Sequence, residues 1–202
     1  MNYSLLIYIP LCLYLLQTVV LMILYSQSNI DDKYIVPTIS LTGMHNLNND
    51  LSYYIYLVSF ILLALLSFIF YSKCLSLSSK THYYIILSIG ICACILNIIQ
   101  GIYSLDRDTI IHENTAYGGI FLHLLSLGIY LYYVRNHNKS VYVLYGLAWL
   151  SLIMMPIAGT TYKIKSKKYK APFSLLAIFQ RLCVLFIILT ATFISKENKC
   201  FK

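Results

Sequence analysis

Charged residues are scarce in this sequence. Asp, Glu, Lys and Arg make up 11% of the 202 residues, whereas apolar and aromatic residues make up 59%, and the mean hydropathy is +0.73. Soluble domains carry about 25% charged residues. This composition argues against a soluble globular domain and predicts that lipid surrounds most of the chain.

The motifs of several enzyme and transporter classes are also missing. The sequence has no nucleophile elbow, phosphate-binding glycine loop, Rossmann fingerprint or HExxH metal spacing, and no arginine at every third position. We therefore expect no cofactor and no metal, and neither a serine hydrolase nor a voltage sensor. Pro156 is the one interior candidate for a broken span, which makes a small-solute channel or transporter the weakest alternative kept.

Continuous apolar stretches occur six times, and each is long enough to cross roughly 30 Å of hydrocarbon as a helix. Transmembrane strands would show short alternating segments, and helices satisfy their own backbone polar groups in lipid. We predict an all-α multi-pass membrane protein, a single domain over residues 1–202 in which six transmembrane helices form one bundle. The first stretch lacks a basic n-region, so we expect an uncleaved span. The predicted spans are about 5–25, 54–71, 83–103, 116–134, 141–159 and 173–195.

Six spans divide the polar segments between two sides of the membrane. Side A holds both termini and residues 72–82 and 135–140, and side B holds the other three loops. Each side carries seven Lys and Arg residues, so the positive-inside rule does not orient the chain. Of the seven acidic residues, six fall on side B: Asp31, Asp32, Asp50, Asp106, Asp108 and Glu113.

Basic residues and cysteines suggest further contacts. The side B lysine run 163–170, which includes Lys167 and Lys168, either meets phosphate-bearing lipid head groups or only flanks a helix. No nucleic-acid partner is expected. The two cysteines outside the spans, Cys74 and Cys200, are on side A, where palmitoylation and an unmodified structural role are the alternatives.

Arg181 is the most costly residue for a membrane span, because it lies inside the sixth apolar stretch directly after Gln180. Its side chain leans toward side B. Snorkelling, an ion pair with Asp106, Asp108 or Glu113, and a ligand contact are the alternatives.

The third loop brings acidic residues and His112 to the start of the fourth span, a set suited to acid–base chemistry. We predict His112, Glu113 and Asp108 as candidate catalytic residues. His123 lies further along the fourth span, and it is either a buried hydrogen-bonded residue or a ligand contact.

Three short stretches resemble one six-span eukaryotic family. Residues 37–43 contain Pro37, Ile39, Ser40 and Gly43 in the pattern Pro-x-Ile-Ser-x-x-Gly, residues 111–114 read Ile-His-Glu-Asn, and residues 173–180 open the last span. This pattern is similar to that of the damage-regulated autophagy modulators, the FGF-receptor-activating protein and a Golgi factor acting after GPI attachment to proteins. In place of the family's acidic residue and aromatic in the last span, this chain has Gln180 and Arg181.

The resemblance implies cytoplasmic termini, a luminal side B and a role in lipid handling, with the GPI-remodelling branch favoured. Golgi or ER membranes are the expected location, with lysosomal or plasma membrane as the alternative. Membrane lipid, including GPI glycolipid, is the expected partner. A non-enzymatic lipid- or sterol-binding organiser remains the main alternative function. The candidate head-group residues are Pro37, Ser40, Gly43, Asp106, His123, Lys167, Lys168, Gln180 and Arg181.

Overall fold

The computed structural model describes residues 3–28, 39–44, 50–75, 77, 79–105, 107–165 and 175–200, and only the backbone of residues 3–5, 40–41 and 159–165. Within these ranges every regular element is a helix, which confirms the predicted all-α class. The elements are the 3₁₀ helix η1 (Tyr3–Tyr8) and the α-helices α1 (Ile9–Gln27), α2 (Ile39–Thr42), α3 (Leu51–Lys73), α4 (Lys80–Ile102), α5 (Thr109–Tyr133), α6 (Lys139–Lys165) and α7 (Leu175–Glu197).

Six helices of the described chain, α1 and α3 to α7, are long and apolar enough to cross a membrane, as predicted. The largest difference at a helix start is in α5, which begins at Thr109 and not near residue 116. Asp108 caps this helix, because its Oδ1 accepts a 2.9 Å hydrogen bond from the N–H of Ile111. The polar first turns of α5 are invisible to a search for apolar runs, so His112 and Glu113 belong to the helix and not to the loop.

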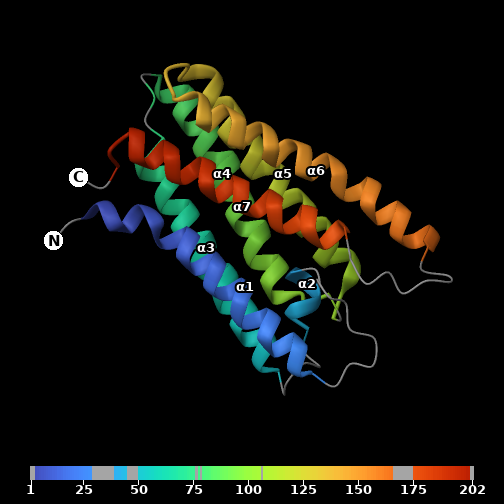
Figure 1. Ribbon diagram of the computed structural model, residues 1–202. Coiled ribbons are helices and arrows are strands. Elements are labelled where there is room, and N and C mark those ends of the chain that lie inside the picture. The colour runs from blue at the N-terminus through green and yellow to red at the C-terminus, as the bar shows by residue number, and fades with distance from the viewer. Residues whose placement is uncertain are drawn as a thin grey trace.

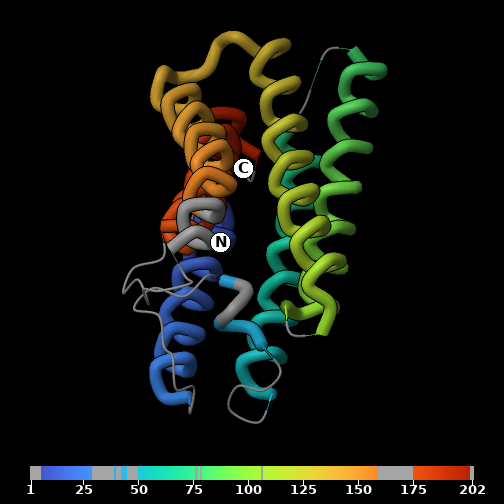
Figure 2. Tube along the Cα trace, turned by 90° about the vertical axis from the view of Figure 1, so that its right-hand side faces the viewer, coloured from blue at the N-terminus to red at the C-terminus, as the bar shows by residue number. Residues whose placement is uncertain are grey.

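The helices pack in two groups. α3, α4 and α5 pack side by side, and α6 lies along α7 while α1 contacts both α3 and α7. Figure 2 shows α1, α6 and α7 in one group and α3, α4 and α5 in the other, with the short helix α2 between them toward the side B end. Both ends of the chain lie at the same end of the bundle (Figure 1), as an even number of spans requires.

Burial is arranged as expected for a helical bundle in lipid. Large apolar side chains on the outside of the spans are exposed, among them Leu16 at 63% and Leu150 at 56%. The interior combines apolar residues with buried tyrosines, and its largest fully buried side chains are those of Tyr56, Tyr71 and Tyr130. Because lipid is as apolar as leucine, buried polar side chains and close packing are what hold such helices together.

Candidate functional site

The loop motif behind the family resemblance reaches the inside of the bundle. Its helix α2 contacts α1, α3 and α7. The N–H of Ile39 donates a 3.0 Å hydrogen bond to Oε1 of Gln180, and the Ile39 side chain is buried against Tyr14 and Leu21 of α1. Gln180 was predicted as a site residue, and it holds the first residue of α2. For Ser40 only the backbone is described.

Gly43 sets how closely this segment approaches α3. A Cβ atom at Gly43 would overlap the ring of Tyr56. Tyr56 is fully buried, its hydroxyl accepts a 3.1 Å hydrogen bond from Nε2 of Gln100, and its ring centroid lies 6.4 Å from that of His112. Tyr56 therefore connects the loop motif to the start of α5.

The three candidate catalytic side chains lie in different surroundings. His112 is 1% exposed, and its Nδ1 donates a 2.6 Å hydrogen bond to the backbone oxygen of Tyr103. Asp108 caps α5, whereas the Glu113 side chain is exposed. The imidazole thus faces the bundle interior while the neighbouring carboxylate faces outward, and the acid–base assignment stays a prediction.

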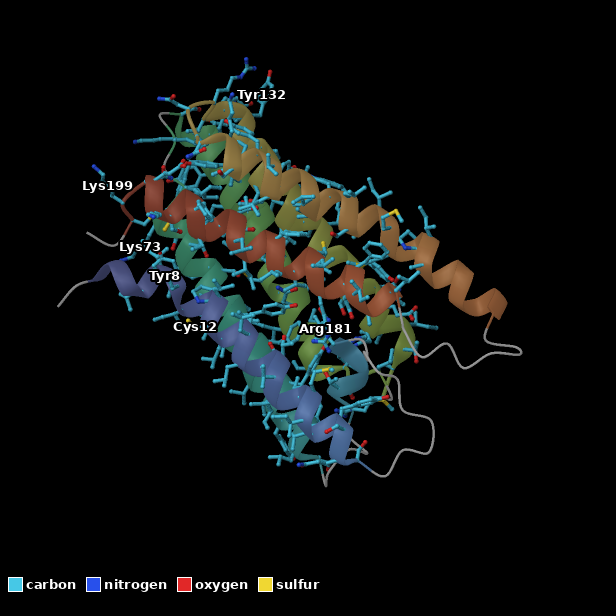
Figure 3. All side chains as sticks on the ribbon, viewed as in Figure 1. Tyr8, Cys12, Lys73, Tyr132, Arg181 and Lys199 are labelled. Carbon is cyan, nitrogen blue, oxygen red and sulfur yellow. The ribbon has the colours of Figure 1, made fainter. Side chains whose placement is uncertain are left out.

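Arg181 faces α1. Its Nη2 lies 3.5 Å from Sδ of Met22, and its backbone oxygen accepts a 2.9 Å hydrogen bond from the Tyr14 hydroxyl. Figure 3 shows Arg181 within the bundle close to α2. These two contacts join α7 to α1 at the same height in the bundle as α2, whose first residue is bound by Gln180.

His123 lies at the centre of a buried polar cluster contributed by three helices. Its Nδ1 is 2.7 Å from the hydroxyl of Tyr71 on α3, and its Nε2 is 2.8 Å from Nδ2 of Asn97 on α4. Gly90 admits Tyr71 to this position, since a Cβ there would lie 2.6 Å from Cγ of the ring. Both ring nitrogens of His123 are satisfied, which fits the buried hydrogen-bonded alternative.

A cavity of about 230 Å³ runs between these helices. Along α7 its lining extends from Gln180 to Ser195, roughly 22 Å of helix axis at 1.5 Å per residue. The walls are mainly aliphatic and aromatic, and none of the described side chains of α6, residues 139–158, is among the lining residues. The polar side chains that line it are Tyr14, Gln17, Ser67, Tyr71, Asn97, Gln100, His123, Gln180, Thr192 and Ser195.

Gln17 differs from the other lining amides. It is 4% exposed, yet its Nε2 has no hydrogen-bond partner among the described residues. Gln100, Asn97 and Gln180 each have one. A buried amide donor without a partner costs about 1–3 kcal/mol, so Gln17 offers a donor to any acceptor that enters the cavity.

The predicted site residues are placed differently with respect to the cavity. Gln180 and His123 line it, whereas Gly43 and His112 lie against Tyr56, which is not among the lining residues. Gln17 was missed, although a glutamine within an apolar span is the same signal that singled out Arg181. Tyr56 and Tyr71 were also missed, because a tyrosine near the end of an apolar span is expected at the membrane interface. The candidates outside the described residues are Pro37, Asp106, Lys167 and Lys168.

Comparison of the chain with known proteins finds no match: no protein-family model, no curated protein and no solved structure matches it. The resemblance of residues 37–43, 111–114 and 173–180 to the six-span lipid-remodelling family therefore stays a prediction.

Proposed function

We propose that this multi-pass membrane protein handles membrane lipid by taking one lipid chain into the cavity between its helices. The observation that carries the proposal is a largely apolar cavity lined by the unpartnered amide of Gln17. Binding sites for small molecules have this character, with apolar walls and a few polar groups that fix orientation.

The size and chemistry of the cavity narrow the ligand class. Its volume of about 230 Å³ lies below the 300–1,000 Å³ that holds drug-sized molecules, which favours a single chain over a two-chain lipid. The lining amides and hydroxyls are uncharged. An ester carbonyl or a hydroxyl group, which accepts a hydrogen bond without carrying charge, matches the Gln17 donor.

The route into the cavity is lateral. Two of its lining residues, Ile9 at the start of α1 and Ile69 near the end of α3, are 41% and 38% exposed. Both lie toward side A, on faces that meet lipid. At the other end Ile39 of α2 and Gln180 contribute to the lining, so a chain enters between α1 and α3 and extends toward α2.

The finer proposal is that this lipid handling serves the remodelling or maturation of GPI-anchored proteins in Golgi or ER membranes, with cytoplasmic termini. The family resemblance supports it, because the Ile39–Gly43 motif and Gln180 are joined by a hydrogen bond at one end of the cavity. GPI glycolipid is then the partner whose chain occupies the site.

Photo-crosslinking tests the proposed binding. The protein in nanodiscs is irradiated with a phospholipid that carries a photoactivatable acyl chain, and the labelled peptides are mapped by mass spectrometry. We expect labels on lining residues of α1, α3 and α7, and a loss of at least half of them in Gln17→Leu and in the cavity-filling Ala191→Phe. Ile153→Phe, at a 55% exposed position of α6, is the matched control. Labels confined to the outer faces of the spans would contradict the proposal.

A cellular measurement tests the GPI assignment separately. Deletion of the gene should change the chain composition of GPI lipids, with wild type restoring it and Gln17→Leu failing to do so at equal expression. An unchanged composition would refute the GPI role while leaving the cavity ligand to be decided by crosslinking.

A second candidate is a lipid-binding organiser that makes and breaks no bond. The separate surroundings of His112, Glu113 and Asp108 favour it. His112→Ala distinguishes the two, because it abolishes remodelling by a catalytic imidazole and leaves a folded organiser active in the same cellular measurement.

A further inference from the structure

The C-terminal end of α7 folds back toward the bundle through a Schellman motif. Lys199 adopts a positive φ of 53°, its N–H donates to the oxygen of Lys196, and the N–H of Cys200 donates to the oxygen of Ser195 at 3.2 Å. These are the two hydrogen bonds that define the motif. Cys200 is thereby directed back along the last turn of α7.

Cys74 receives this segment at the end of α3. Its side chain is 1% exposed, and its backbone oxygen accepts a 2.7 Å hydrogen bond from Nδ2 of Asn198. Asn198 is held a second time by the Tyr130 hydroxyl, at 2.6 Å. In Figure 3 Lys73 and Lys199, the sequence neighbours of the two cysteines, lie at the same end of the molecule.

The two cysteine side chains belong to one packed group. Cys200 packs against the buried cluster that contains Cys74, and Asn198, two residues before Cys200, donates to the Cys74 backbone oxygen. The Cys200 side chain, as a hydrogen-bonding neighbour, lowers the pKa of the Cys74 thiol, and the Cys74 side chain raises the pKa of the Cys200 thiol. The Cys74 sulfur is therefore the better thiolate, and Cys200, which is partly exposed, is the one that a reagent reaches.

We propose that Cys74 and Cys200 form a reversible disulfide that fastens the end of α7 to the end of α3. The proposal rests on the paired thiols and not on the proposed lipid function. The oxidant is a small-molecule disulfide. The Cys200 thiol passes its proton to the neighbouring Cys74 thiolate, attacks one sulfur of the oxidant and releases one small thiol, and Cys74, again as thiolate, then attacks the Cys200 sulfur and releases the second. One small disulfide gains two electrons, and the two protons from the protein thiols end on the two released thiols.

The disulfide would act at the side A end of the cavity. Ser195, whose carbonyl anchors Cys200, also lines the cavity. Oxidation would fix this end of α7, whereas reduction leaves it held by Asn198 and the helix cap. Because Cys74 is buried, palmitoylation of its sulfur would require this end of α7 to move away.

Counting free thiols tests the proposal. The full-length protein in nanodiscs is equilibrated with oxidised glutathione, denatured and labelled with a polyethylene-glycol maleimide that shifts its mobility once per thiol. We expect the number of labels to fall from six to four, the chain having six cysteines, and reduction to restore six. Cys200→Ser, which replaces the more exposed partner, should keep all five of its thiols.

Cys92→Ser is the matched control, since Cys92 is exposed within α4. It should fall from five labels to three. A fall of two in Cys200→Ser, a disulfide-linked dimer on a non-reducing gel, or a stable adduct of one glutathione per chain would each overturn the proposal, as would six labels in the wild type after oxidation.

Discussion

At the scale of single residues, polar side chains within apolar spans mark the places where helices are joined. Asn97, His123 and Tyr71 connect three helices, and Gln100 with Tyr56 connects two. Their positions can be read from the sequence, because a polar residue in lipid needs a partner. Their partners cannot, since each partner comes from a helix distant in sequence.

Replacement of His123 should destabilise the bundle through its two partners. His123→Leu leaves the Tyr71 hydroxyl and the Asn97 amide without their hydrogen bonds, and interhelical hydrogen bonds in membranes contribute about 0.6 kcal/mol on average and up to ~1.7. We expect a loss of about 1–2 kcal/mol in the free energy of unfolding, measured by denaturant titration in detergent. The double variant His123→Leu/Tyr71→Phe should recover part of it. Full stability of the single variant would show that the cluster contributes nothing.

Two glycines give a matched pair of substitutions. Gly90→Ala places a Cβ 2.6 Å from the Tyr71 ring and should cost about 1–3 kcal/mol by overpacking. Gly146→Ala meets nothing within 4 Å and should be neutral or slightly stabilising because alanine favours the helix. Thermal unfolding of both variants in the same detergent measures the difference, and equal midpoints would contradict the packing argument.

At the scale of elements, α2 and the C-terminal cap of α7 are held by contacts with helices distant in sequence. α2 has four residues, too few for a helix to be stable alone. Its contacts with α1, α3 and α7 and the hydrogen bond to Gln180 hold it in the bundle. The apolar pattern predicted the long helices, whereas α2 could not be predicted because its formation depends on tertiary contacts.

Removal of the Gln180 acceptor should loosen α2. Gln180→Leu leaves the Ile39 N–H without its side-chain partner, and a lost buried hydrogen bond of about 1–3 kcal/mol corresponds to roughly 5- to 160-fold more local opening. Hydrogen exchange of the peptide containing residues 39–44, followed by mass spectrometry, measures the effect. Gln27→Leu, at an exposed position at the end of α1, is the control. Equal exchange in both variants would remove Gln180 from this role.

At the scale of the whole molecule, six spans place the helix connections on alternate sides of the membrane. Figure 2 shows that α4 leads into α5 at one end of the bundle and α5 leads into α6 at the other. Equal numbers of Lys and Arg on the two sides left the orientation undecided from charge, and the family resemblance implies cytoplasmic termini.

Cysteine labelling tests this topology in sealed vesicles. In a background without the native cysteines, Arg107→Cys and Ser140→Cys should react with a membrane-impermeant maleimide from opposite sides. Cytoplasmic termini require Ser140→Cys to react from the cytoplasmic side. Labelling of both positions from the same side would contradict the six-span bundle, and the reversed pattern would contradict the orientation that the resemblance implies.

The sequence by itself determined the number of spans, the helical class and several of the residues that line the interior. It could do so because lipid imposes one requirement on every segment, an apolar run about twenty residues long with its backbone bonded internally. The tertiary structure alone decided which polar groups meet: Gln180 with Ile39, His123 with Tyr71 and Asn97, and Cys200 with Cys74. It also decided that Gln17 is left to face the cavity. The position of a helix along the chain follows from local composition. Which polar side chains meet depends on the rotation and axial shift of helices that are distant in sequence, and the sequence of a single span does not specify these.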